Sequence, residues 1–263
     1  MIKRRVYGFA IDLKSTLTSL NLWGSIVAVT LFAFTLPSRG CMLDRLFELL
    51  KGPIYQFMDD GGLPKFMAWM MPHTLVSVII GRETEVLLNC IQFRLPRYRY
   101  RSSFWLSHSI KIIFITIVYY LLLFASVVGV AVLTGNVMPG VSFQMGRLIH
   151  TDNDNTVLLM SLLFFRACLP MCIILHVQSF CQVAFRSAFA GGVVFVLLVA
   201  VSAFIPESVF SKYMIGNWLI LSRSIHMQAN TGINDTTILI GVFVSFLLIQ
   251  AVGLRLFKNI SWY

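Results

Sequence analysis

RETEVLLNCIQFRLPRYRYRSSFWLSHSIK, residues Arg82 to Lys111, is the longest strongly charged stretch in a chain of 263 residues that is otherwise mostly apolar. Its only acidic residues are Glu83 and Glu85. The apolar runs on both sides are too long for ordinary core helices. A polar segment between two membrane spans lies in water, and a short basic one is typical of the cytoplasmic face. The stretch therefore predicts a membrane protein with a basic cytoplasmic segment.

The composition supports the same class of protein. Hydrophobic residues make up 57% of the chain and charged residues only 12%, and the mean hydropathy is +0.80. Soluble domains carry about 25% charged residues, so a soluble fold could not cover its surface with this supply. We expect one all-α, polytopic transmembrane domain over residues 1–263.

The apolar runs predict six transmembrane helices. They lie at about 18–36, 65–81, 112–134, 157–182, 187–205 and 236–254. Residues 1–17 mix basic and apolar positions at helical spacing, which predicts an amphipathic helix in the interface; an extension of the first span is the alternative. About half of residues 206–235 are apolar, although the segment is expected outside the membrane. This composition predicts short outer helices before the last span. Another short helix is expected on the outer surface at 43–50.

The distribution of charge sets the expected orientation. If the chain starts in the cytoplasm and spans six times, 13 of the 21 Lys and Arg residues lie in inside segments, whereas 8 of the 11 acidic residues lie outside. This asymmetry follows the positive-inside rule and places both termini in the cytoplasm. Because the charge flanks the spans, a nucleic-acid partner is not expected.

Motifs for catalysis are missing from the sequence. It contains no GxxxxGK[ST] phosphate loop, no HExxH metal motif and no GxSxG nucleophile elbow. No acidic residue falls within a predicted span, and Cys168 and Cys172, four residues apart, fit small apolar packing better than metal binding. The prediction is a chain that is not an enzyme and binds no cofactor or metal.

Arginines alternate with aromatic residues in the second half of the charged stretch. The pattern fits a docking surface for a protein, a belt for lipid headgroups or a nucleic-acid patch, or only the charge that any cytoplasmic loop carries. A separate candidate is Arg166, which lies inside a predicted span. It is expected either to line a translocation path or to pair with a carboxylate of the outer loops.

Two stretches and the layout carry a resemblance to a known family. The stretches are FRLPRYRYRSSFWLSHSIKI before the third predicted span and MIGNWLILSRS, Met214 to Ser224, before the last. With an interfacial N-terminal helix and six spans, the chain resembles membrane-spanning permease subunits of ABC-type exporters, in particular small Gram-positive permeases for peptides, bacteriocin immunity or antibiotic resistance.

The resemblance implies a division of labour between subunits in a bacterial cell membrane. A partner ATPase would bind ATP and Mg²⁺, while this chain would form the path as a dimer with itself or a second permease, surrounded by membrane lipid. The segment 82–111 would be the coupling helix, and amphipathic peptides would be the substrate. The implied contacts with the ATPase are Glu83, Arg94, Arg97, Tyr98, Arg99, Arg101, Phe104 and Trp105. A membrane anchor or signalling partner that holds a soluble protein through the same segment is the alternative function.

Overall fold

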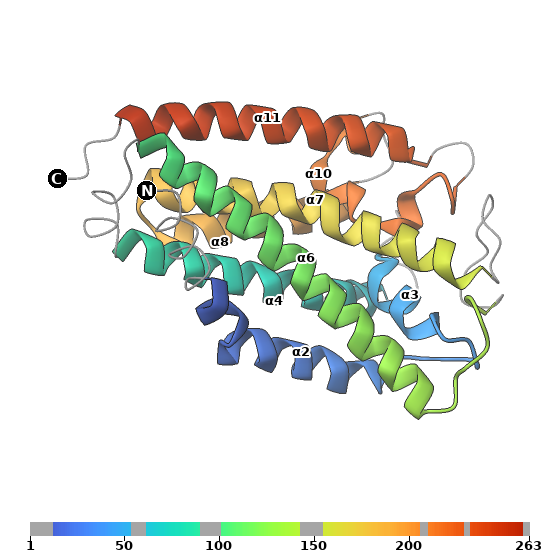
Figure 1. The fold of residues 1–263 in the computed structure, drawn as a ribbon. Helices are drawn as coiled ribbons and strands as arrows, with labels where there is room; N and C mark the ends of the chain where they lie inside the picture. The colour runs from blue at the N-terminus through green and yellow to red at the C-terminus, as the bar shows by residue number, and fades with distance from the viewer. Residues whose placement is uncertain are drawn as a thin grey trace.

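The computed structural model describes residues 13–53, 62–89, 101–142, 155–205, 210–228 and 232–259. In these ranges the chain is helical, with two isolated β-bridges and no longer strand. Figure 1 shows long helices that run side by side as a bundle. The long helices are α2 (Leu20–Ala33), α4 (Gly62–Asn89), α6 (Arg101–Leu133), α7 (Thr156–Phe185) and α11 (Asp235–Asn259).

The apolar helices are those of a membrane protein. Five helical stretches of the described chain are long and apolar enough to cross a bilayer, the first of them Leu13–Ala33. The all-α class is therefore confirmed for the described residues, and five of the six predicted spans overlap with these helices. Of the predicted interfacial helix, residues 13–17 are helical and precede a break at Thr18 and Ser19, while 1–12 lie outside the described residues.

The remaining predicted span, 187–205, is a shorter helical segment. It consists of α8 (Ala188–Val196), the π-helical turn η2 (Leu197–Val201) and α9 (Ser202–Phe204). Its 17 residues would rise about 26 Å, less than the roughly 30 Å of a hydrocarbon core. The six-span count therefore stays a prediction.

The hairpin between α7 and α8 is tight. Arg186 has a left-handed conformation, with φ of 50°, and ends α7, while the side chain of Ser187 caps α8. A Cβ at Gly191 would lie 2.2 Å from Cγ of Gln182, so this glycine is needed for the close approach of α8 to α7.

Two helices extend further than the sequence predicted. α4 continues to Asn89, eight residues past its predicted end, and α6 begins at Arg101, eleven residues before its predicted start. A change from apolar to charged residues marks the expected membrane boundary and not the end of a helix. Glu83 and Lys111, which lie in the predicted cytoplasmic segment between two spans, are therefore residues of α4 and α6. The end of the bundle where α4 ends and α6 begins is called the basic end below (Figure 1).

The opposite end is closed by α3 (Asp44–Leu50), which is buried and not on the surface as expected. Its first residue, Asp44, is fully buried and accepts hydrogen bonds from the backbone N–H groups of Arg39, Cys41 and Ser142, at 2.8, 3.2 and 2.7 Å. The charged carboxylate thus holds two loops against the helix. Leu46, Leu49 and Leu50 of α3 belong to the main hydrophobic core. The leucine pattern therefore packs α3 against the bundle.

The second stretch of the resemblance, Met214 to Ser224, folds against the end of the 188–204 segment. It contains α10 (Ile215–Trp218) and the turn η4 (Leu221–Arg223). The buried guanidinium of Arg223 donates hydrogen bonds to the carbonyl oxygens of Ser202 and Ala203, at 2.8 and 2.6 Å. Arg223 thereby satisfies carbonyls that the end of α9 leaves without helical partners.

The packing of α6 against α11 predicts the effect of one substitution. A Cβ at Gly253 of α11 would lie 2.3 Å from Nε1 of Trp105, whereas a Cβ at Gly129 of α6 would meet nothing within 4 Å. Gly253→Ala should therefore lower the free energy of unfolding by about 1–3 kcal/mol because the core is overpacked. Gly129→Ala, the matched control, should leave it unchanged or raise it. Thermal unfolding in a mild detergent measures both, and equal midpoints for the two variants would contradict this packing.

Candidate functional site

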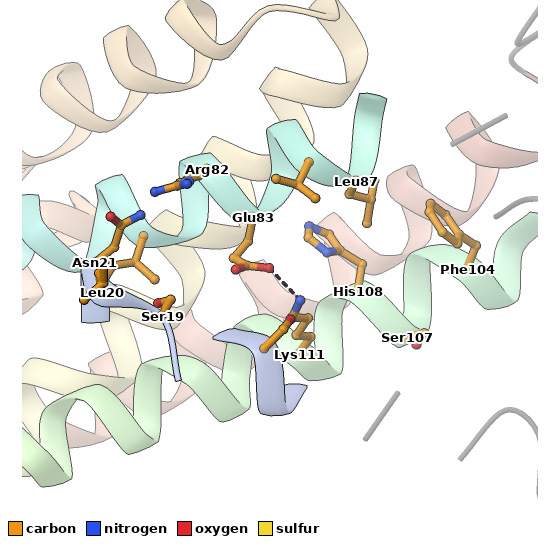
Figure 2. Close-up of a pocket in the computed structure, with 13 residues that line it drawn as sticks. Ser19, Leu20, Asn21, Arg82, Glu83, Leu87, Phe104, Ser107, His108 and Lys111 are labelled. Atoms are coloured by element: carbon orange, nitrogen blue, oxygen red, sulfur yellow. Dashed lines mark hydrogen bonds and ion pairs between the residues drawn. The ribbon is translucent and has the colours of Figure 1, made fainter. Parts of the chain in front are cut away.

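An ion pair joins α4 to α6 at the basic end. Nζ of Lys111 lies 2.6 Å from Oε2 of Glu83, and the two side chains are only 12% and 19% exposed. Figure 2 shows this contact between the two helices. The residues that it joins flank the basic segment in the sequence, so the pair closes a loop of 27 intervening residues at its base. Partial burial reduces screening by water and makes the attraction stronger than that of an exposed pair.

An aromatic group fixes the start of α6 to two further helices. Trp105 is fully buried, with ring centroids 5.3 Å from Phe257 of α11 and 6.2 Å from Phe180 of α7. Phe104 is 3% exposed and lies 5.9 Å from Phe257. With Leu87 and Val183 these residues form a small core of their own, called the Trp105 cluster below. The cluster connects the start of α6 to α7 and α11.

Next to this cluster, polar side chains pair with one another inside the bundle. Oγ of Ser179 lies 2.8 Å from Nε2 of His108 and 2.9 Å from Oγ1 of Thr84, which brings α4, α6 and α7 together. At the preceding residue of α7, Oε1 of Gln178 accepts from the hydroxyl of Ser77 at 2.8 Å, and Nε2 of Gln178 donates to the backbone oxygen of Ser77 at 3.0 Å. Such pairs satisfy polar groups that lipid cannot.

The sequence prediction did not include this polar group. Gln178, Ser179 and Gln182 share the basic half of α7, and all three are buried. Their spacing of one and four residues places them on one side of a helix, which is the signal that could have shown them. Their partners lie on other helices, far away in the sequence. His108, for example, is 71 residues from Ser179. No local pattern therefore indicates these contacts.

The predicted partner contacts divide into three groups. Glu83, Phe104 and Trp105 are described, and each is engaged within the chain, as the contacts above show. Arg101 is the first residue of α6. Arg94, Arg97, Tyr98 and Arg99 lie outside the described residues. The structure thus brings the flanks of the basic stretch together, and the contact with a partner stays a prediction.

Arg166 has partners at the opposite end. Its side chain is 1% exposed, and Nη2 lies 2.6 Å from Oδ1 of Asp235 and donates to the carbonyl of Ile233 at 2.8 Å. Oδ2 of the same carboxylate lies 2.7 Å from Nε2 of His226. This is the arrangement expected from pairing with an outer carboxylate, because Asp235 is the first residue of α11.

Metal ligands do not gather in the described part of the chain. No group of three or more His, Cys, Asp or Glu side chains there could hold an ion. Cys168 and Cys172 are free, buried thiols, and both belong to the hydrophobic core, where they act as small apolar side chains.

The comparisons with known proteins identify no relative. No family model, no curated protein and no solved structure matches the chain.

The pairing of Arg166 predicts a non-additive effect on stability. Asp235→Asn leaves a buried guanidinium without its counter-charge, and the cost should be about 3 kcal/mol. Adding Arg166→Met removes that charge, so the double variant should be more stable than Asp235→Asn alone. Thermal unfolding of the three variants in detergent measures the coupling. Simple addition of the two single effects would show that the ion pair has no role in stability.

Proposed function

We propose that the chain is the membrane-spanning subunit of an ATP-driven, ABC-type exporter in a bacterial cell membrane. It works as a dimer, with itself or with a second permease. The basic segment 82–111 docks on a separate ATPase subunit, which binds ATP and Mg²⁺. Both termini lie in the cytoplasm, and amphipathic peptides are the proposed substrate.

The observation that best supports this proposal is the double attachment of the basic segment. On its flanks, the Glu83–Lys111 ion pair joins α4 to α6, and the Trp105 cluster joins α6 to α7 and α11. A force applied between these flanks would therefore reach four of the long helices. Coupling by rigid-body motion requires such packed contacts, because closely packed elements transmit displacement and loose loops do not.

The contacts also distinguish two roles among the proposed coupling residues. Arg94, Arg97, Tyr98, Arg99 and Arg101 are proposed to meet the ATPase directly. Glu83, Phe104 and Trp105 already contact residues of this chain, so they are proposed to hold the docking surface in place. Arginine and aromatic side chains are the usual anchors of protein interfaces, which suits the first group.

A membrane anchor for a soluble partner is the second candidate, and Arg166 is the observation that favours it. The one charged residue predicted to line a path is instead paired with Asp235 and almost completely buried. An exporter would then need its path elsewhere, between two copies of the chain. An anchor would bind its partner through the same segment but would not change the partner's rate of nucleotide hydrolysis.

Purification of the tagged chain in mild detergent, with nucleotide hydrolysis assayed in the eluate, tests the proposal. We expect an ATPase to co-purify. It should be lost when Arg97→Glu and Arg99→Glu reverse the charge of the segment, and kept with Arg255→Glu, a reversal on α11. Phe104 is unsuitable as a test because truncating a buried ring would disturb the fold. An intact chain that retains no ATPase, or one whose ATPase is unaffected by the charge reversal, would refute the exporter.

A further inference from the structure

A cavity of about 420 Å³ opens at the basic end between the start of α2, the end of α4 and the start of α6. Figure 2 shows its polar lining, which includes Ser19, Asn21, Arg82, Glu83, His108 and Lys111. The volume falls in the range of roughly 300–1,000 Å³ that is usual for small-molecule sites. None of the roles proposed above explains why three charged side chains face this space.

The charges of the lining favour an anion. Lys111 and Glu83 neutralise each other at 2.6 Å, which leaves the guanidinium of Arg82 as the excess charge of the cavity. Arg82 is exposed and makes no ion pair with another described residue. A guanidinium presents paired donors that match two oxygens of a phosphate.

The start of α2 borders the same space. The hydroxyl of Ser19 caps α2 by accepting from the N–H of Leu22. The first N–H groups of a helix have no acceptor within it, and the first two residues of α2, Leu20 and Asn21, both line the cavity. Backbone donors in this position favour phosphate and other anions.

His108 adds a buried ring to the wall of the cavity. Its ring is 4% exposed and lines the cavity, and its Nδ1 has no hydrogen-bond partner among the described residues. The other ring nitrogen, Nε2, lies 2.8 Å from the hydroxyl of Ser179, which can donate to it. Nδ1 is enclosed by protein atoms, so the His108 ring forms part of the cavity wall and offers no donor to the space.

The apolar part of the lining indicates where the anion comes from. Ile79, Val86 and Leu87 of α4, with Phe104 of α6, complete the wall. Arg82 lies seven residues before the end of α4, about 10 Å of helix rise. A polar group near the end of an apolar helix, beside apolar side chains, is at the depth of lipid headgroups.

We propose that this cavity binds a phosphate group, supplied by the headgroup of an anionic phospholipid. Arg82 holds the phosphate oxygens, the start of α2 lies beside them, and the apolar wall contacts the adjoining glycerol and acyl chains. The ligand would fill the space between α2 and the α4–α6 pair and stabilise their packing. The proposal does not depend on an ATPase partner.

Thermal unfolding of the full chain in a neutral detergent tests this site. Phosphatidylglycerol is titrated against phosphatidylcholine, and inorganic phosphate is added in a separate arm. We expect phosphatidylglycerol to raise the midpoint by about 5 °C more than phosphatidylcholine when it is far above its dissociation constant. The difference should be lost in Arg82→Gln, restored in part in Arg82→Lys, and kept in Arg255→Gln, whose arginine is outside the cavity.

Each result decides the proposal. A gain that survives Arg82→Gln, or that disappears equally in Arg255→Gln, shows general attraction of lipid to a basic surface and overturns the site. Equal effects of the two lipids overturn it as well. A rise with inorganic phosphate that Arg82→Gln abolishes, without a preference between the lipids, keeps the phosphate site but replaces the lipid with a soluble ligand.

Discussion

The ion pair between Glu83 and Lys111 is the contact on which the basic end of the bundle depends. The contact joins two residues that lie at opposite ends of the most basic part of the sequence. Without this contact, the carboxylate of Glu83 and the ammonium of Lys111 would each be a partly buried charge without a counter-charge. Such a charge lowers the stability of the fold. With the ion pair, the last turns of α4 and the first turns of α6 are held together. The same pair neutralises two of the three charges that line the neighbouring cavity.

A second constraint comes from the bilayer, which offers no hydrogen-bond partners. The helices satisfy their own backbones, and the polar side chains in the bundle pair across helices, as Ser77 does with Gln178 and Ser179 with His108. Glycines permit close packing elsewhere in the bundle, for example Gly191 against Gln182 and Gly253 against Trp105. The charged groups at the opposite end obey the same rule, because Arg166 finds Asp235 and Asp44 finds backbone donors. Several buried polar groups therefore find their partners in a distant part of the chain.

Local patterns in the sequence were sufficient to predict the class of fold. Long apolar runs predict helices because only their length and composition matter, and five of the six predicted spans overlap with such helices. The helices α4 and α6 are longer than the predicted spans, because a change to charged residues predicts the membrane boundary and not the end of a helix. The burial of α3 also needed the structure, since an apolar pattern does not specify which surface it will face.

The candidate site could be predicted only in part. The segment 82–111 was evident from its charge, but the side chains that hold it pair with residues far away in the sequence. Trp105 contacts Phe257, and Ser109 pairs with Gln250 across 141 residues. Nothing in the local sequence around Arg166 identifies Asp235 as its partner. The cavity beside His108 is likewise a product of three helices meeting, and so it has no counterpart in a single stretch of sequence.

The most direct measurement of the central claim is a charge exchange at the base of the segment. Glu83→Lys and Lys111→Glu are compared singly and together by thermal unfolding, with Glu85→Lys, an exposed position on the same helix, as the control. We expect each single variant to be destabilised and the exchange to recover much of the loss, with a coupling of about 1–3 kcal/mol, between the values for exposed and buried pairs. A double variant that loses the sum of the two single effects would contradict the claim that this ion pair joins α4 to α6.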